Sequence, residues 1–359
     1  MKKTTSVLAA LSIAVTFSPA EVSAEALTDR VNLKGDFRLR YEGIDEQGQE
    51  SRDRFRYRAR FGVEAEVQDD VDVILELSTG ADNPVSANTT IDGGFNKDEF
   101  RINLAYVKWA ASDSVTVLAG KMKNPMFRPG KSQLIFDNDL TPEGASVVFE
   151  SGNLFGNASV FAVEERSSED DSFLYSVQGG AKVDVSDDAS VTFGAGYLVY
   201  TNTVGFTPFF NGSSKSNSVD TDGNYIYDYK NVELFAQFDT QVGDWPLQLY
   251  THWTENSDPD EENTAYAFGG KLGSAKKKGT MQFIYTYQDV EADAVIGTFN
   301  DSNFGSSGTD ADGHIVRYKY ALTDKATLGG SLFVNSIDRF QDVEKDYDRI
   351  QIDIEFKFN

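Results

Sequence analysis

The sequence predicts an all-β protein, a transmembrane antiparallel up-and-down β-barrel of about 16 strands. Three features point to this fold class: apolar and polar residues alternate in many segments, these segments are long, and short linkers alternate with long ones. Successive side chains of a strand point to opposite faces, so each alternating segment has one apolar and one polar face. The longest segments reach about 12 to 15 residues, whereas a globular strand averages about 5 to 6 and a bilayer needs about 9 to 11.

The clearest strands are expected at residues 31–42 and 53–67, joined by a polar loop. Their apolar faces carry residues such as Leu39 and Phe61. Their polar faces carry a ladder of arginines, namely Arg38, Arg40, Arg54, Arg56, Arg58 and Arg60. An Arg at the lipid-facing midplane costs about 2 to 4 kcal/mol, so the ladder is expected to face an aqueous lumen.

The remaining strands follow in the same rhythm. They are expected at residues 71–79, 100–106, 115–119, 145–150, 157–163, 172–185, 191–200, 232–238, 247–253, 264–272, 281–287, 314–320, 328–335 and 349–358. The short linkers are 69–70, 111–113, 186–189, 242–245 and 322–326, and the long ones are 42–52, 80–98, 122–143, 201–224, 289–313 and 336–347. Short turns at one end and long loops at the other are typical of outer-membrane barrels, and aromatic residues near both strand ends sketch two interfacial belts.

The N-terminus resembles a secretory signal peptide. Two lysines precede an apolar run at residues 7–17, and a small-residue site ends at Ala24. Residues 1–24 are therefore expected to be removed, leaving residues 25–359 as a single transmembrane barrel domain. A retained membrane anchor is the alternative for the apolar run, which is too short to span as a helix.

Composition narrows the function. The net charge is −24 and the pI about 4.4, which argues against nucleic acid as a partner. The absence of Cys excludes disulfides and any Cys nucleophile. His252 and His314 are the two histidines, and neither has a Ser or carboxylate at a recognisable catalytic spacing, so no enzyme activity, cofactor or metal site is expected. Fragments of calcium loops at 220–224 and 310–313 lack the closing Glu, which leaves loose divalent-ion binding open.

Several motifs resemble a known family. They are Gly35-Asp-Phe-Arg-Leu-Arg-Tyr-Glu42, Arg52-Asp-Arg-Phe-Arg-Tyr-Arg-Ala-Arg-Phe61, Ala105-Tyr-Val-Lys-Trp109, Lys121-Met-Lys-Asn-Pro125 and Asp137-Asn-Asp-Leu-Thr-Pro-Glu-Gly144. With the alternating last strand, they resemble the Gram-negative outer-membrane porins called putative porins. One departure is Asn359 after Phe358, where such proteins usually end on the aromatic residue.

The resemblance implies a location and a set of partners. It implies an outer-membrane channel for passive diffusion of small hydrophilic solutes and ions, surrounded by outer-membrane lipid and lipopolysaccharide and assembled as a homotrimer. It also implies that the third long loop folds inward near residues 122–143 as a constriction. This segment has three prolines and no period-two pattern, which independently predicts a structured loop.

The constriction loop carries Asp137, Asp139 and Glu143, which are expected to oppose the arginine ladder across the pore. Charges about 10 Å apart interact by about 0.4 kcal/mol in water, enough to orient and filter solutes. Replacing Arg56 and Arg58 by Ser is expected to shift the pore toward cations. The alternative is that the ladder is a solvated face paired with lumenal Glu and Asp.

The sequence is also compatible with two other functional classes. An outer-membrane barrel with a blocked lumen would act as a surface receptor or adhesin through its acidic extracellular loops. A soluble exported β-protein would place the polar faces in bulk water.

Overall fold

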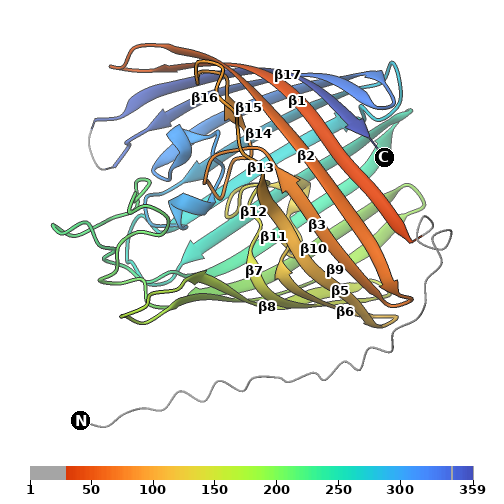
Figure 1. Cartoon of the computed structure of the whole chain (residues 1–359), viewed down its shortest axis with the longest axis horizontal. Coiled ribbons are helices and arrows are strands. Elements are labelled where there is room, and N and C mark those ends of the chain that lie inside the picture. The colour runs from red at the N-terminus through yellow and green to blue at the C-terminus, as the bar shows by residue number, and fades with distance from the viewer. Residues whose placement is uncertain (1–29, 341–342, 359) are drawn as a thin grey trace, which may run out of the picture.

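The computed structural model describes residues 30–340 and 343–358, so the expected signal peptide at residues 1–24 lies outside the described residues. Within them the chain forms one closed antiparallel β-barrel (Figure 1). Strands β1 (Val31–Glu46) and β17 (Lys345–Phe358) close it, pairing from Gly35 with Phe358 to Glu46 with Tyr347. Closure leaves no unpaired sheet edge among the described strands, which a barrel in a membrane requires.

In the described part of the chain the wall has 16 long strands, which confirms the predicted fold class and strand number. Those between β1 and β17 are β2 (Arg52–Gln68), β3 (Val71–Ser78), β5 (Arg101–Ser112), β6 (Val115–Lys121), β7 (Glu143–Ser151), β8 (Leu154–Glu164), β9 (Ser172–Ser186), β10 (Ala189–Tyr200), β11 (Lys230–Val242), β12 (Trp245–Asn256), β13 (Thr264–Gly273), β14 (Met281–Val290), β15 (Ala311–Thr323) and β16 (Ala326–Ile337). The sequence pattern did not reveal β4 (Thr89–Thr90), which pairs with Arg56 and Tyr57 of β2 beyond the end of the short β3.

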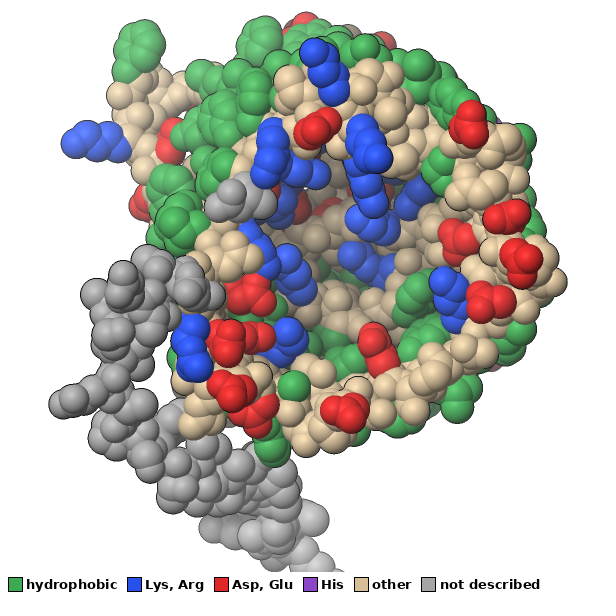
Figure 2. All heavy atoms as spheres, turned by 90° about the vertical axis from the view of Figure 1, so that its right-hand side faces the viewer, with side chains coloured by type: hydrophobic (Ala, Val, Ile, Leu, Met, Phe, Trp, Pro, Cys, Tyr) green, Lys and Arg blue, Asp and Glu red, His purple; other side chains and the backbone are tan. Residues whose placement is uncertain are grey.

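The apolar residues of the alternating strands form the outer surface of the barrel. Leu39, Phe61 and Ile352 are 42%, 45% and 48% exposed, and the space-filling view shows apolar side chains around the rim (Figure 2). These side chains lie on the face expected to contact lipid, while the polar positions of the same strands point inward. The described residues contain no helix long and apolar enough to cross a bilayer.

The long loops fill much of one end of the barrel, on the left in Figure 1. Loop segments 122–142, 201–229 and 291–310 pack against one another and against inward-facing wall residues, and they contribute the buried side chains of Leu134, Phe209, Tyr225 and Phe304. The loops also contain the short 3-10 turns η1 (Pro129–Lys131), η2 (Gly297–Phe299) and η3 (Gly305–Ser307). This packing leaves the aqueous space mainly toward the end with the short turns.

Candidate functional site

A cavity of about 1490 Å³ lies inside the barrel. Figure 2 looks into the short-turn end, where the molecule is hollowed and Lys and Arg side chains line the hollow. The lining comes from most of the wall strands and from loop 122–142. The cavity therefore joins a charged wall to a loop that reaches into the lumen.

Strand pairing gathers the predicted arginine ladder on one part of the wall. Arg38 faces Arg58 and Arg40 faces Arg56 across the β1–β2 register. Unscreened like charges directly opposite each other destabilise a sheet. Carboxylates on the same inward faces must therefore offset the repulsion.

Those carboxylates come from the strands themselves. Asp36 Oδ1 accepts from Arg58 Nη2 at 2.7 Å, and its Oδ2 accepts from Arg60 Nε at 2.7 Å. Asp353 accepts two hydrogen bonds from Arg40, at 2.7 and 2.8 Å.

The rest of the ladder meets a third carboxylate, Glu42, and an amide, Asn88. Glu42 pairs with Arg54 and lies 3.7 Å from Arg56. Arg38 forms no ion pair within the described residues, and its Nη2 donates to Asn88 Oδ1 at 2.6 Å. The ladder is thus a mixed-charge wall, in which three wall carboxylates offset about half of the positive charge of the six arginines.

The three loop carboxylates predicted to oppose the ladder occupy different environments. Asp139 Oδ1 lies 3.6 Å from Arg58 Nη1 and 3.8 Å from Arg60 Nη1. Glu143 begins β7 and pairs with Lys121 at 2.8 Å. Of the predicted acidic set, Asp139 is the residue that the structure brings against the ladder.

Asp137 is buried where two loops meet. Its carboxylate accepts from the backbone N–H of Asp139 at 2.7 Å and of Ser302 at 2.8 Å. Burial, followed by the charges of Asp139 and Asp301, raises the pKa of Asp137 above its ordinary range. Asp137 therefore ties loop 122–142 to loop 291–310.

Wall residues that the sequence did not single out hold the constriction loop in place. Gln178 binds Phe127 through both a backbone N–H and a carbonyl, at 2.7 and 3.0 Å. Gln237 Oε1 accepts from Gly130 N–H at 2.7 Å. A single alternating strand cannot show which of its inward residues will meet a distant loop, so only the folded barrel revealed these anchors.

His252 also belongs to this anchor. Its Nδ1 lies 3.0 Å from Ser132 Oγ, and its Nε2 lies 2.7 Å from Glu233 Oε1. The order of groups resembles a catalytic triad, but the three side chains come from distant positions, which explains why sequence spacing missed them. Ser132, His252 and Glu233 are only 5%, 1% and 2% exposed, so the hydroxyl serves loop packing rather than contact with a solute.

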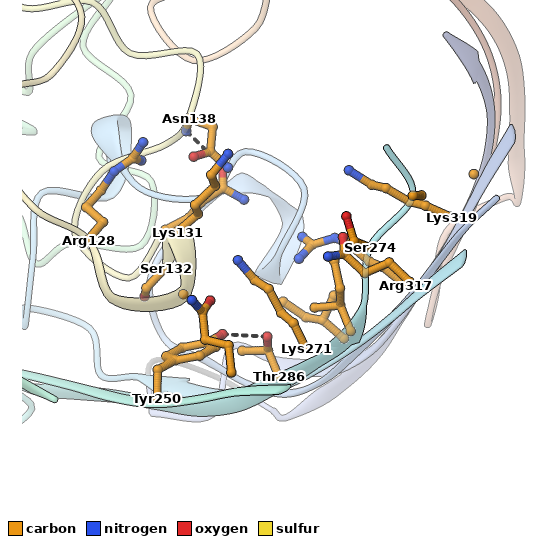
Figure 3. Close-up of a pocket in the computed structure, with 18 of the residues that line it drawn as sticks. Arg128, Lys131, Ser132, Asn138, Tyr250, Lys271, Ser274, Thr286, Arg317 and Lys319 are labelled. Carbon is orange, nitrogen blue, oxygen red and sulfur yellow. Dashed lines mark hydrogen bonds between the residues drawn. The ribbon is translucent and has the colours of Figure 1, made fainter. Parts of the chain in front are cut away.

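A second group of cations lies in the same cavity. Lys131 of the loop, Lys271 of β13, and Arg317 and Lys319 of β15 line it and point into a shared space (Figure 3). The sequence pattern gives no sign of this cluster, because its members are far apart in the chain and each strand contributes only one or two.

A closed barrel with an apolar exterior and a charged aqueous interior defines a membrane channel. The family model described as "Putative porin" matches residues 45–227 and 216–358. The chain belongs to this family, and it is an outer-membrane channel protein. No curated protein matches the sequence.

Solved structures share the fold at low sequence identity. OprB of Pseudomonas putida, in its high-pH structure, aligns with a TM-score of 0.62 and 12% identity over 93% of this chain and 96% of that chain. A loop-deletion mutant of OmpT, an outer-membrane protein of Vibrio cholerae, gives 0.52 and 12% over 92% and 100%. A triple mutant of Rhodopseudomonas blastica porin gives 0.52 and 12% over 91% and 100%. The comparisons give no support to a receptor or adhesin.

Proposed function

We propose that the mature chain is a single barrel domain that lets small hydrophilic solutes and ions diffuse passively across the outer membrane. The observation that carries this proposal is the 1490 Å³ cavity, which is lined largely by charged and polar side chains inside an apolar shell. Such a lining favours solutes that keep part of their hydration. The family and the barrel fold are those of channels, which favours a protein without enzyme activity.

The narrow part of the pathway is proposed to lie between Asp139 and the arginine ladder. Asp139 is held near Arg58 and Arg60 from the loop side, and the anchors at Gln178 and Gln237 fix that loop against the wall. A fixed array of opposite charges orients dipolar solutes without binding them tightly. Selectivity then depends on the positive charge that remains after these carboxylates are counted.

The surroundings of the barrel complete the proposal. The long loops face the lipopolysaccharide of the outer leaflet and the short turns face the periplasm, as is usual for such barrels. A signal peptide at residues 1–24 delivers the chain, and a homotrimer is the proposed assembly, as the family resemblance suggests.

Purified protein in planar bilayers tests the function directly. Steady single-channel steps in KCl are expected, together with swelling of protein-containing liposomes in small sugars but not in large oligosaccharides. A sample that shifts on gels after boiling, and is therefore folded, but gives neither conductance nor swelling would refute the proposal.

Cell fractionation and crosslinking test the remaining parts. The protein is expected in the outer-membrane fraction with an N-terminus at Glu25, as read by mass spectrometry. Crosslinking of the unboiled protein is expected to give a ladder that ends at three chains. A single uncrosslinked species would refute the trimer and leave the channel proposal standing.

A further inference from the structure

Strands β13 and β15, which flank β14 in the barrel wall, bring cations together near the constriction loop. The register places Lys271 of β13 opposite Ile284 of β14, and Ile284 opposite Arg317 of β15. Two strand spacings separate Lys271 from Arg317, or about 10 Å, and Lys319 lies two residues further along β15, or about 7 Å. Lys131 approaches from the loop, so the four side chains surround one part of the cavity (Figure 3).

This cation cluster, defined as Lys131, Lys271, Arg317 and Lys319, differs from the arginine ladder in its charge balance. Arg317 lies 3.8 Å from Asp301, its one ion pair in the described part of the chain. Within residues 30–340 and 343–358, no ion pair involves Lys131, Lys271 or Lys319. Five of the six ladder arginines, in contrast, lie within 4 Å of Asp36, Glu42 or Asp353, and Arg38 is the exception.

The cations of the cluster act on one another. Lys131, Arg317 and Lys319 are the charged groups that interact unfavourably with Lys271, and Asp239 opposes them only in part. Two like charges about 10 Å apart repel by about 0.4 kcal/mol in water, and more where low-dielectric walls focus the field. A bound anion would relieve several such repulsions at once.

The side chains can reach a ligand. Lys131 and Lys319 are exposed to the lumen, and Lys271 and Arg317 are half-buried. Lysine carries three donors on a flexible stem, and arginine presents a planar fork that matches an oxyanion. Ser274 and Gln282 line the same region and add polar groups between the cations.

We infer that the cation cluster is a binding site for small oxyanions with two or more negative charges, of which inorganic phosphate is the simplest probe. This inference rests on the proposed channel function and names a class of solute for it. The ligand passes on to the short-turn end after leaving the constriction. The cluster holds it more strongly than one charge does, because Asp239 and Asp301 offset its cations only in part and Glu355, which acts on Lys319, pairs with Lys357.

The test measures block of KCl current by inorganic phosphate at pH 8, added on the short-turn side of channels in a planar bilayer. In the wild type, current is expected to fall and to saturate as phosphate rises. In the double variant Lys271→Gln with Lys319→Gln, the half-saturating concentration is expected to rise at least about tenfold. The charge-preserving pair Lys271→Arg with Lys319→Arg is expected to keep the block.

Lys182→Gln is the matched control, because Lys182 lines the cavity from β9, away from the cluster, and forms no ion pair in the described chain. This variant is expected to keep the half-saturating phosphate concentration of the wild type. If phosphate did not block the wild-type current in a saturable way, the inference would be overturned. An equal loss in Lys182→Gln would also overturn it, because diffuse lumenal charge would then explain the effect.

Two further measurements keep the outcomes separate. Equilibrium dialysis of the detergent-solubilised protein against labelled phosphate measures binding independently of conductance. A protein that binds phosphate but does not conduct ions would refute the proposed channel function and support the binding site. If the double variant lacks the gel shift of a folded barrel, Lys131→Gln replaces it, since Lys131 lies in the loop and not in the wall. Unchanged phosphate binding in that variant would count against the cluster.

Discussion

Replacing Asp139 by Asn tests whether this residue sets the charge of the constriction. The substitution keeps the shape of the side chain and removes one negative charge near Arg58 and Arg60, at 3.6 and 3.8 Å. Both arginines keep their closer partner Asp36 at 2.7 Å, so the wall is expected to stay folded. The expected result is a higher preference for anions.

The magnitude follows from Coulomb's law. A permeating ion about 7 Å from the lost charge interacts with it by about 0.6 kcal/mol in water. Salt at 0.1 M, with a Debye length of about 10 Å, reduces this to about 0.3 kcal/mol. The anion gains this amount and the cation loses it, so the chloride-to-potassium permeability ratio is expected to rise about threefold.

The assay is the reversal potential in a tenfold KCl gradient. Glu143→Gln serves as the control, because it removes the same charge from the end of the same segment, where Glu143 pairs with Lys121. Its ratio is expected to match the wild type. An unchanged ratio in the Asp139 variant, or an equal change in both, would show that Asp139 does not lie on the ion path.

Three other perturbations have expected outcomes. Replacing Arg56 and Arg58 together by Ser removes two positive charges and is expected to shift the reversal potential toward cations; no shift would mean that the paired ladder has no net effect on ions. Gly130→Ala is expected to disturb the loop and increase current noise, because Gly130 has φ +57 and a Cβ there would lie 2.2 Å from the Tyr250 ring. Current traces of this variant as quiet as those of the wild type would contradict this. Because the pKa of Asp137 is raised where the loop is docked, the docked loop favours the protonated carboxyl group of this residue. Loop docking is therefore expected to be strongest near pH 4 and to weaken as pH rises through the raised pKa. Voltage-induced closure should accordingly vary with pH in the wild type and not in Asp137→Asn.

Some of this architecture was predictable because its cause is local. The alternation in residues 31–42 and 53–67 specifies two faces, and the cost of an arginine in lipid decides which face turns inward. The lengths of the linkers then show which end of the barrel carries the short turns and which carries the long loops. The inward position of Arg58 and the outward position of Phe61 follow from these rules alone.

Other features depended on contacts between distant segments. Asp353 meets Arg40 only because β17 closes the barrel against β1, and Ser132 meets His252 only because the loop folds onto β12. Strand alternation fixes the face of a residue but not its partner across the lumen.

The sequence by itself therefore determined the barrel, its lipid-facing surface and its arginine-rich wall, since each follows from the period of a strand and the cost of charge in hydrocarbon. Only the tertiary structure decided which charges are neutralised. Register, closure and loop packing placed carboxylates beside the ladder and left Lys131, Lys271 and Lys319 without ion pairs in the described chain, because electrostatic balance depends on distances that no single segment contains.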